Sequence, residues 1–232
     1  MVAIKGLEKF ASKDYPGYIS ATVFLGGCNF RCPFCHNADL VLRPETLPGV
    51  AEADFLAFLD QRKDWLEAVC VSGGEPLLQP ELESLLRAVK ERGFRTKLDT
   101  NGSLPARLEA VLGSGLVDAV AMDIKAPLEK YWATTRSEVR EEDVRRSAAL
   151  VRGSGLEYMF RTTAVPGLIA EEDLVAIGRW LEGADLFQLQ PFVARTTLDP
   201  EFLKVKPYSK ESMEKLADAV RPYFKDVRLE GV

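Results

Sequence analysis

Several features that mark other classes of protein are missing from this sequence. It has a single histidine, and 30 Lys and Arg against 35 Asp and Glu leave a net charge of −5. That balance argues against attachment to nucleic acid or to an anionic membrane through overall charge. No apolar run approaches the ~18 residues of a membrane-spanning helix, and the N-terminus lacks the apolar core of a signal peptide. We therefore expect a cytoplasmic protein with neither membrane nor nucleic acid among its partners.

Cysteine is also scarce, and it is unevenly placed. The chain has four cysteines, too few for a secreted disulfide scaffold of 232 residues, and Cys28, Cys32 and Cys35 lie close together. In a reducing compartment such clustering indicates metal binding. Cys70 stands apart in the apolar run AVCVS, where we expect a small buried residue.

The remaining composition is that of a globular chain, with 47% hydrophobic and 28% charged residues. No repeat or flexible linker divides it, so we predict one domain over residues 1–232, with a core at about 15–192 and a C-terminal helix and tail at 193–232. Short apolar strands alternate with helical patterns. The expected strands are 18–25, 68–72, 95–99, 117–124, 157–165 and 186–192, with a short tail strand at 227–229. The expected helices are 52–62, 81–92, 105–112, 141–152, 171–181 and 209–220.

This alternation predicts an α/β fold with a parallel sheet covered by helices. Eight strand–helix units would close a full barrel, whereas six leave an open, partial barrel or a doubly wound sheet. Polar or Gly/Pro clusters follow the strand ends, where a parallel sheet brings them to one rim. Turn residues alone would explain two of these clusters, but not the cysteines, Glu75, Asp123 or Lys125. The clusters are 28–37, 73–76, 99–102, 123–125, 166–167 and 190–192.

The spacing C-x3-C-x2-C supplies three soft thiolate ligands. A structural zinc site takes four ligands, and an ordinary cubane iron–sulfur cluster takes four cysteines. His36 directly follows Cys35, which makes it an awkward fourth ligand. Three cysteines on a cubane would leave one iron open for a substrate or cofactor. A zinc site and free thiols remain as alternatives.

Four motifs together resemble the radical S-adenosylmethionine (SAM) superfamily. They are the cysteine motif with the aromatic Phe34 before its last cysteine, Gly73-Gly74-Glu75-Pro76, Asp99-Thr100-Asn101-Gly102 and Asp123-Ile124-Lys125. The last two are similar to motifs of glycyl-radical-enzyme activating enzymes. The opening Asp14-Tyr15-Pro16-Gly17 with ATVFLGGCNFRCPFCHN looks most like the anaerobic ribonucleoside-triphosphate reductase activating proteins. The resemblance runs from about residue 10 to residue 192.

This resemblance implies a partial (β/α)6 barrel of the radical SAM type and a [4Fe–4S] cluster on Cys28, Cys32 and Cys35. It implies that SAM binds the open iron and that one electron, from a flavodoxin or ferredoxin-type donor, cleaves it to methionine and a 5′-deoxyadenosyl radical. In the activating enzymes that radical takes a hydrogen atom from a glycine of a large partner, here the anaerobic ribonucleotide reductase. Two alternatives stay open. One is a radical SAM enzyme acting on a small molecule or on RNA, and the other is a non-enzymatic zinc or electron-transfer module.

The resemblance also implies roles for individual residues. Gly73 and Gly74 would let the backbone approach the methionyl ammonium, with Glu75 an acceptor or a carboxylate that locks the turn. Asp99, Thr100 and Asn101 would offer acceptors to the ribose hydroxyls or to a cation.

Asp123 and Lys125 alternate, so both should point to one side of their strand. If that side is the interior, the charges need partners. Lys125 would pair with the cofactor carboxylate, and Asp99 and Asp123 could share a monovalent cation. A plain structural ion pair is the alternative. Arg161 is either a cofactor or substrate contact or an outward-facing arginine.

Two further positions have no firm role. His36 is either a proton donor or a loop hydrogen-bond partner. Relatives place a residue against the adenine near 190–192, where this chain has no histidine.

Overall fold

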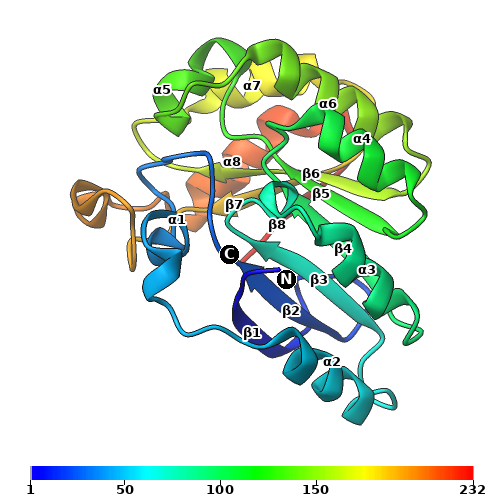
Figure 1. The fold of residues 1–232 in the computed structure, drawn as a ribbon. Coiled ribbons are helices and arrows are strands. Elements are labelled where there is room, and N and C mark those ends of the chain that lie inside the picture. Colours follow the sequence, from blue (N-terminus) through cyan, green and yellow to red (C-terminus); the bar gives the residue numbers. More distant parts are fainter. Residues whose placement is uncertain (1, 232) are drawn as a thin grey trace.

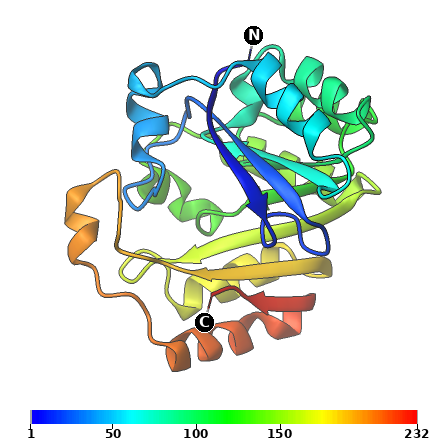
Figure 2. The same cartoon turned by 90° about the horizontal axis from the view of Figure 1, so that it is seen from below.

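A computed structural model describes residues 2–231 and contains one eight-stranded sheet whose strands follow chain order from β1 to β8. β1 (Ile4–Ala11) pairs antiparallel with β2 (Ser20–Leu25), and every later pair is parallel. The later strands are β3 (Ala68–Gly73), β4 (Arg95–Thr100), β5 (Ala119–Asp123), β6 (Glu157–Ala164), β7 (Ala184–Pro191) and β8 (Phe224–Leu229). β1 and β8 are the two edges of the sheet, and they remain apart when the molecule is seen from below (Figure 2). The sheet is therefore an open, partial barrel.

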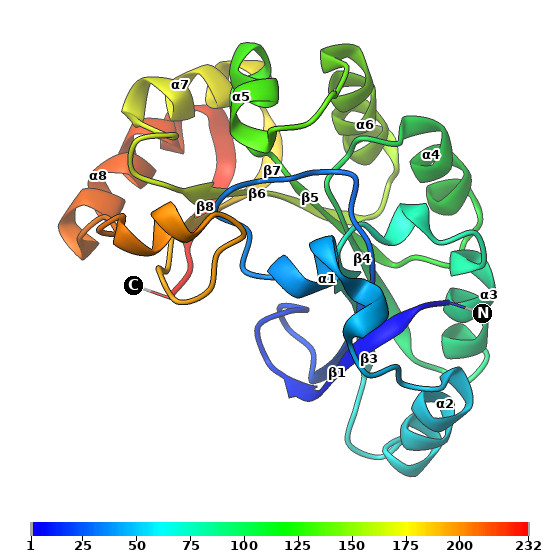
Figure 3. The same cartoon turned by 60° about the vertical axis from the view of Figure 1, so that its left-hand side comes forward.

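Helices cover the outer face of this curved sheet (Figure 1). The long ones are α2 (Glu52–Gln61), α3 (Leu82–Lys90), α4 (Pro105–Gly113), α6 (Glu141–Gly153), α7 (Glu171–Trp180) and α8 (Lys210–Val220). α3 shows why: Leu82, Leu85, Leu86 and Val89 recur at helical spacing, and all four are fully buried. Two short helices, α1 (Ala38–Leu42) and α5 (Tyr131–Thr135), follow strand C-termini, and α1 lies on the open side of the barrel (Figure 3).

Each central strand divides its side chains between two environments. On β3, Val69 and Val71 pack in the core beneath the helices, whereas Cys70 and Ser72 point into the barrel. At the end of the barrel where the strands begin, Tyr15 packs against Ala68 and Ala119. Tyr15 and Ala119 also line a second cavity of about 320 Å³ at that end.

The predicted α/β class and partial barrel are confirmed, and all six predicted central strands form. The tail strand begins at Phe224, earlier than predicted. β1 escaped prediction because it is a largely exposed edge strand with charged residues and no buried run. α1 and α5 have five residues each, too few for helical periodicity to show. Within residues 2–231 no helix is long and apolar enough to cross a membrane.

Candidate active site

Five of the six predicted clusters contribute residues to one cavity of about 420 Å³ at the rim where the parallel strands end. Residues from β2 to β7 and the loops after them line it. The lining includes these predicted site residues: Cys28, Cys32, Phe34, Cys35, Gly73, Gly74, Asp99, Thr100, Asn101, Asp123, Lys125 and Arg161. Glu75 and the Pro166–Gly167 turn are not among its lining residues.

The three cysteines stand on one loop, residues 26–37, which we call the Cys loop. Cys32 is 6% exposed, and Cys28 and Cys35 are partly buried. The Sγ atom of Cys28 accepts hydrogen bonds from the backbone N–H of Phe30 (3.4 Å) and from the Asn101 amide (3.8 Å). Burial raises the pKa of all three thiols, that of Cys32 to about 12. Metal binding must therefore displace protons from them.

The donor set fits a cubane cluster better than a single metal ion. Among the described residues, no three His, Cys, Asp or Glu side chains are placed to hold one ion, as zinc requires. A cubane binds each cysteine at a different iron, so its thiolates need not converge on one point. His36 is exposed and lies beside the Phe192 ring, with centroids 6.0 Å apart. Cys70 lies inside the barrel, 3.7 Å from Lys97 Nζ, so it is buried but not in apolar surroundings alone.

The backbone around Gly73 and Gly74 leaves no room for a side chain at either position. Gly73 has φ +119°, and a Cβ there would lie 2.3 Å from Leu25 N. A Cβ on Gly74 would lie 1.8 Å from the carbonyl oxygen of Gly27. We expected the missing Cβ atoms to let a ligand approach, and the packing of the protein's own backbone also requires them. The glycines let the turn press against the backbone that leads into Cys28, while still bordering the cavity.

Glu75 holds this turn against the next one. Its Oε1 accepts hydrogen bonds from Leu77 N–H (3.1 Å) and the Thr100 hydroxyl (2.9 Å), and its Oε2 accepts one from Asn101 N–H (2.6 Å). The side chain is fully buried behind the cavity wall. Of the two interpretations of Glu75, this geometry is that of the turn-locking carboxylate.

The burial of Glu75 predicts a pH-dependent stability. Burial raises its pKa to about 7, against the opposing hydrogen bonds from Asn101, Leu77 and Thr100. An unfolded glutamate has a pKa of ~4.3, so between these values the folded state binds the proton more tightly. This contribution to stability is full below about pH 4 and falls by about 4 kcal/mol as the pH rises from 4 through 7.

Chemical denaturation of the metal-free chain between about pH 5 and 8 measures this slope. The Asp99 and Asp123 carboxyls, with lowered pKa values, and the buried thiols, with raised ones, titrate outside that window. Glu75→Gln cannot ionise, so its free energy of unfolding should lack the decline. Parallel curves for the two proteins would show that Glu75 stays ionised throughout.

Asn101 connects the third strand-end turn to the Cys loop. Its amide nitrogen donates to Asn29 Oδ1 (3.0 Å) and points to Cys28 Sγ, while its Oδ1 accepts from Ser103 N–H (2.9 Å). Asn29 in turn donates to the Ser103 hydroxyl (2.8 Å). Sequence reasoning missed Asn29 and Ser103, because no spacing rule marks a contact between such distant turns. The Asn101 side chain is thus committed to the protein and shapes the cavity wall.

The hydrogen bond from Asn101 to sulfur should raise the reduction potential of a cluster on Cys28, since donors to sulfur favour the more negative reduced state. Asn101→Ala should lower the midpoint potential by roughly 40 mV, the one-electron equivalent of about 1 kcal/mol. Redox titration of the reconstituted protein measures it. Asn37→Ala is the matched control, because its side chain also borders the cavity but donates to Gly73 O. Equal shifts in both variants would contradict a specific N–H···S effect.

A chain of charges lies below the cysteines. Arg161 bridges two carboxylates, with Nη1 3.1 Å from Asp99 Oδ2 and Nε 2.8 Å from Asp123 Oδ1. Lys125 Nζ is 2.9 Å from Asp123 Oδ2, as their alternation predicted, and the buried Lys97 contacts Asp99. Arg161 therefore points inward and lines the cavity, so it is not the outward-facing arginine that the sequence left as an alternative. Lys125 and Arg161 border the cavity together with the carboxylates of Asp14, Asp99 and Asp123, whereas Lys97 does not line it.

These pairings keep both carboxylates ionised. Burial alone would raise the pKa of Asp99 and Asp123, but Arg161, with Lys97 beside Asp99 and Lys125 beside Asp123, lowers both below the usual range. Burial opposes the charge on Lys125, yet Asp123 raises its pKa above the ordinary value. Lys125 borders the cavity, so its ammonium is placed to meet an anionic group of a ligand there.

The fold and the site define a β/α-barrel enzyme with its reaction centre at the C-terminal rim of the strands. A sequence profile of the radical SAM superfamily matches residues 22–180. A protein of Methanocaldococcus jannaschii, provisionally named a glycyl-radical enzyme activating enzyme, is 31% identical over 97% of this chain and 94% of its own length. The pyruvate formate-lyase-activating enzyme of Streptococcus mutans is 31% identical over 82% of this chain and 76% of that enzyme.

The fold of this chain is also similar to that of solved structures. Streptococcus suis SuiB bound to S-adenosylmethionine superposes with a TM-score of 0.69 at 20% identity, over 88% of this chain. The aligned part is 48% of SuiB, so this chain spans about half the length of that protein. The chain belongs to the radical SAM superfamily. Its cofactors are those of the family, a [4Fe–4S] cluster and SAM.

Proposed function

We propose that this protein activates a glycyl-radical enzyme. The observation that carries the proposal is the relative named for that activity, which aligns with 97% of this chain and 94% of its own length. The cavity supports it, because about 420 Å³ suits one cofactor-sized ligand. A substrate must then reach the reacting atom from the open rim, as a loop of a large protein does. When bound, the cluster and SAM supply a 5′-deoxyadenosyl radical, which removes a hydrogen atom from the substrate.

The chain's own residues bind and orient these groups. Cys28, Cys32 and Cys35 hold the cluster. Lys125 borders the cavity and would pair with the methionyl carboxylate of SAM. The Gly73-Gly74 turn, which also borders the cavity, would receive the methionyl ammonium.

The other lining residues form the walls of the site. Phe34 and Thr100 border the cavity, where they exclude water and limit the position of the nucleoside. Asp99 offers its carboxylate to a ribose hydroxyl while Arg161 keeps it ionised.

A monovalent cation beside Asp99 and Asp123 remains a prediction. The structure places the Arg161 guanidinium between these carboxylates, so a cation would have to share them with it. Comparing SAM cleavage in potassium, sodium and tetramethylammonium salts tests the cation. Equal rates in all three would remove it.

The proposed partner is an anaerobic ribonucleotide reductase, supported by the similarity of residues 14–37 to its activating proteins. A flavodoxin or ferredoxin-type protein is the proposed electron donor. Anaerobic reconstitution with iron and sulfide should give a brown protein that releases 5′-deoxyadenosine from SAM on reduction. Electron paramagnetic resonance should then show a glycine-centred radical when that reductase is added, and none with pyruvate formate-lyase.

Three other outcomes separate the alternatives. A radical on pyruvate formate-lyase alone would change the partner but keep the function. Cleavage of SAM with no protein radical would favour a small-molecule or RNA substrate. A colourless zinc protein without SAM cleavage would remove the enzymatic function.

A further inference from the structure

The segment between β7 and α8 crosses the Cys loop. We call residues 193–205 the strap; in Figure 1 they form the orange projection beside α1, and Figure 2 shows the same proximity. The contact is specific, because Asp199 N–H donates to the carbonyl oxygen of Pro33 at 2.9 Å. Phe202 of the strap also meets Phe192 edge-on, with centroids 6.4 Å apart. The strap therefore packs on the Cys loop between Cys32 and Cys35.

Arg136 fastens the strap to the opposite side of the loop. Its Nη1 lies 2.6 Å from Asp199 Oδ2, and its guanidinium lies 5.9 Å from the centre of the Phe202 ring. Among the described residues, Arg136 is the only non-glycine with positive φ, at 48°. A left-handed arginine is unfavourable unless its surroundings hold it, and such positions often mark constrained sites. Arg136 adopts this left-handed conformation as the C-cap of α5, where its N–H donates to the carbonyl oxygen of Trp132 at 2.8 Å, and this helix end directs the side chain to the strap.

The backbone next to Arg136 also forms a hydrogen bond with the Cys loop. The carbonyl oxygen of Thr135, the preceding residue, accepts a hydrogen bond from Arg31 N–H at 2.9 Å. The Cys loop is thus held at Arg31 from α5 and at Pro33 from the strap, on either side of Cys32. Most of this loop has no helix or strand of its own to order it.

We propose that Arg136 and Asp199 form a latch that keeps the three cysteines of the Cys loop arranged for ligation before any cluster binds. The latch acts as a positioning device, since neither residue is placed among the ligands. The inference rests on the proposed role of the cysteines in the enzyme's function. It gives α5 and the strap, both outside the cysteine motif, a role in assembling the site.

Alkylation of the metal-free chain tests the latch without any radical chemistry. Iodoacetamide modification, followed by mass spectrometry for each cysteine, reports how often the loop opens. Asp199→Asn retains the backbone donor to Pro33 and an acceptor for Glu201 N–H, but loses the charge. Arg136→Gly removes the guanidinium while suiting the positive φ. In both variants Cys32 should be modified about fivefold faster, the order expected for the loss of one partly exposed ion pair.

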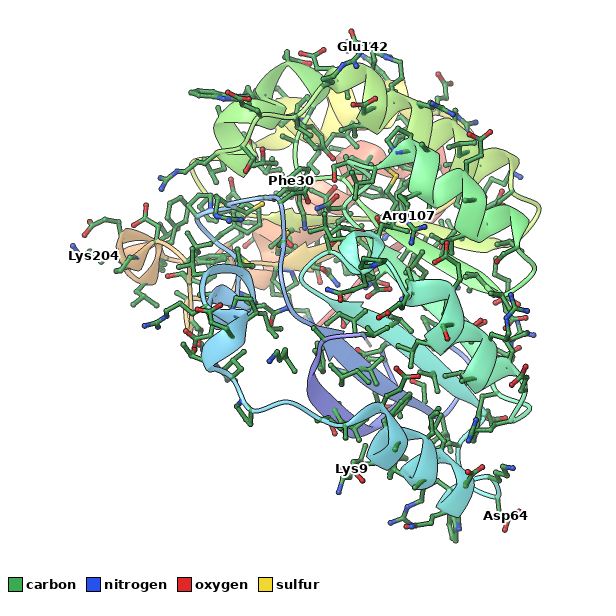
Figure 4. The ribbon with its side chains drawn as sticks, in the orientation of Figure 1. Lys9, Phe30, Asp64, Arg107, Glu142 and Lys204 are labelled. Carbon is green, nitrogen blue, oxygen red and sulfur yellow. The ribbon has the colours of Figure 1, made fainter. Side chains whose placement is uncertain are left out.

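Two controls make the result specific. Arg136→Lys keeps the charge and should restore a rate near that of the unmodified chain. Lys204→Met removes an exposed ion pair with Glu201 in the same strap; Lys204 points away from the body of the molecule in Figure 4, and its loss should change nothing. Cys70 is fully buried inside the barrel and should react equally slowly in every variant.

Faster modification of Cys32 with Cys70 unchanged supports the latch. An unchanged Cys32 rate overturns it, and so does a joint rise at Cys32 and Cys70, which would show general unfolding. After reconstitution, the latch variants should also lose their cluster absorbance to an iron chelator several-fold faster than Lys204→Met. Because alkylation needs neither SAM nor a partner, a failed latch and a failed activase function would be seen in different experiments.

Discussion

Cys32→Ala should abolish SAM cleavage, with 5′-deoxyadenosine formation falling at least a thousandfold, whereas Cys70→Ala should stay within about twofold of the unmodified enzyme. The reason is geometric. Cys32 lies on the Cys loop at the edge of the cavity, so removing its thiolate takes a protein ligand from one iron. Cys70 lies deeper in the barrel beside Lys97 and does not line the cavity.

The two alanine variants are a matched pair, because both remove one buried sulfur. Iron and sulfide content, visible absorbance and 5′-deoxyadenosine release should be measured on both after identical anaerobic reconstitution. The cluster content of Cys70→Ala should equal that of the unmodified chain. Comparable losses in the two variants would contradict the assignment of the ligands.

The second large effect is expected at Arg161. Arg161→Met leaves Asp99 and Asp123 close together in the barrel without their shared cation. Removing one partner of a buried ion pair costs about 3–5 kcal/mol, because the remaining charge loses its compensation. The free energy of unfolding of the metal-free chain should fall by that amount. The affinity of the reconstituted protein for SAM should fall more than tenfold, since one of the two basic side chains that line the cavity beside Asp99 and Asp123 is lost.

An exposed arginine provides the control for this prediction. Arg146 pairs with Glu109 on the surface, and Arg146→Met should cost less than about 1 kcal/mol and leave SAM binding unchanged. The double variant Arg161→Met with Asp123→Asn should recover part of the lost stability, since it removes the repulsion between the Asp99 and Asp123 carboxylates that Arg161 no longer bridges. Chemical denaturation and equilibrium dialysis measure the two quantities. A loss at Arg161 no larger than that at Arg146 would show that the charge chain does not hold the site together.

Much of the site could be predicted because its residues follow a topological rule. The carboxyl ends of parallel strands share one rim, so Cys28, Gly73, Asp99 and Asp123 were expected to meet, and they line one cavity. The Asp123–Lys125 pair followed from the two-residue period of a strand.

The two-residue period of a strand also marks further residues that point into the barrel. Lys97 precedes Asp99 by two residues, and Gln188 precedes Gln190 by two, each within a strand of otherwise buried type. Polar residues at alternate positions of a buried strand predict a polar inner face. This pattern marks Lys97 as an inward-pointing residue, and the structure places it there.

Other parts of the site have no local signal. The contact of Asn101 with Asn29 and that of Asp199 with Pro33 join residues far apart in the sequence. Short helices such as α5 are set by such contacts rather than by periodicity: the Tyr131 hydroxyl accepts from Lys125 N–H at 3.1 Å, and the Tyr131 ring meets Phe30. The glycine pair shows a related limit, because composition cannot tell whether a ligand or a neighbouring backbone requires the missing Cβ.

The central claim is that three cysteines leave one iron of the cluster for SAM, and Mössbauer spectroscopy tests it most directly. The protein would be reconstituted with ⁵⁷Fe and its spectrum recorded with and without SAM under exclusion of oxygen. We expect SAM to change the isomer shift of one iron in four and to leave the other three unchanged. If SAM changed the isomer shift of none of the four irons, as expected when a side chain already binds each one, that result would contradict the account.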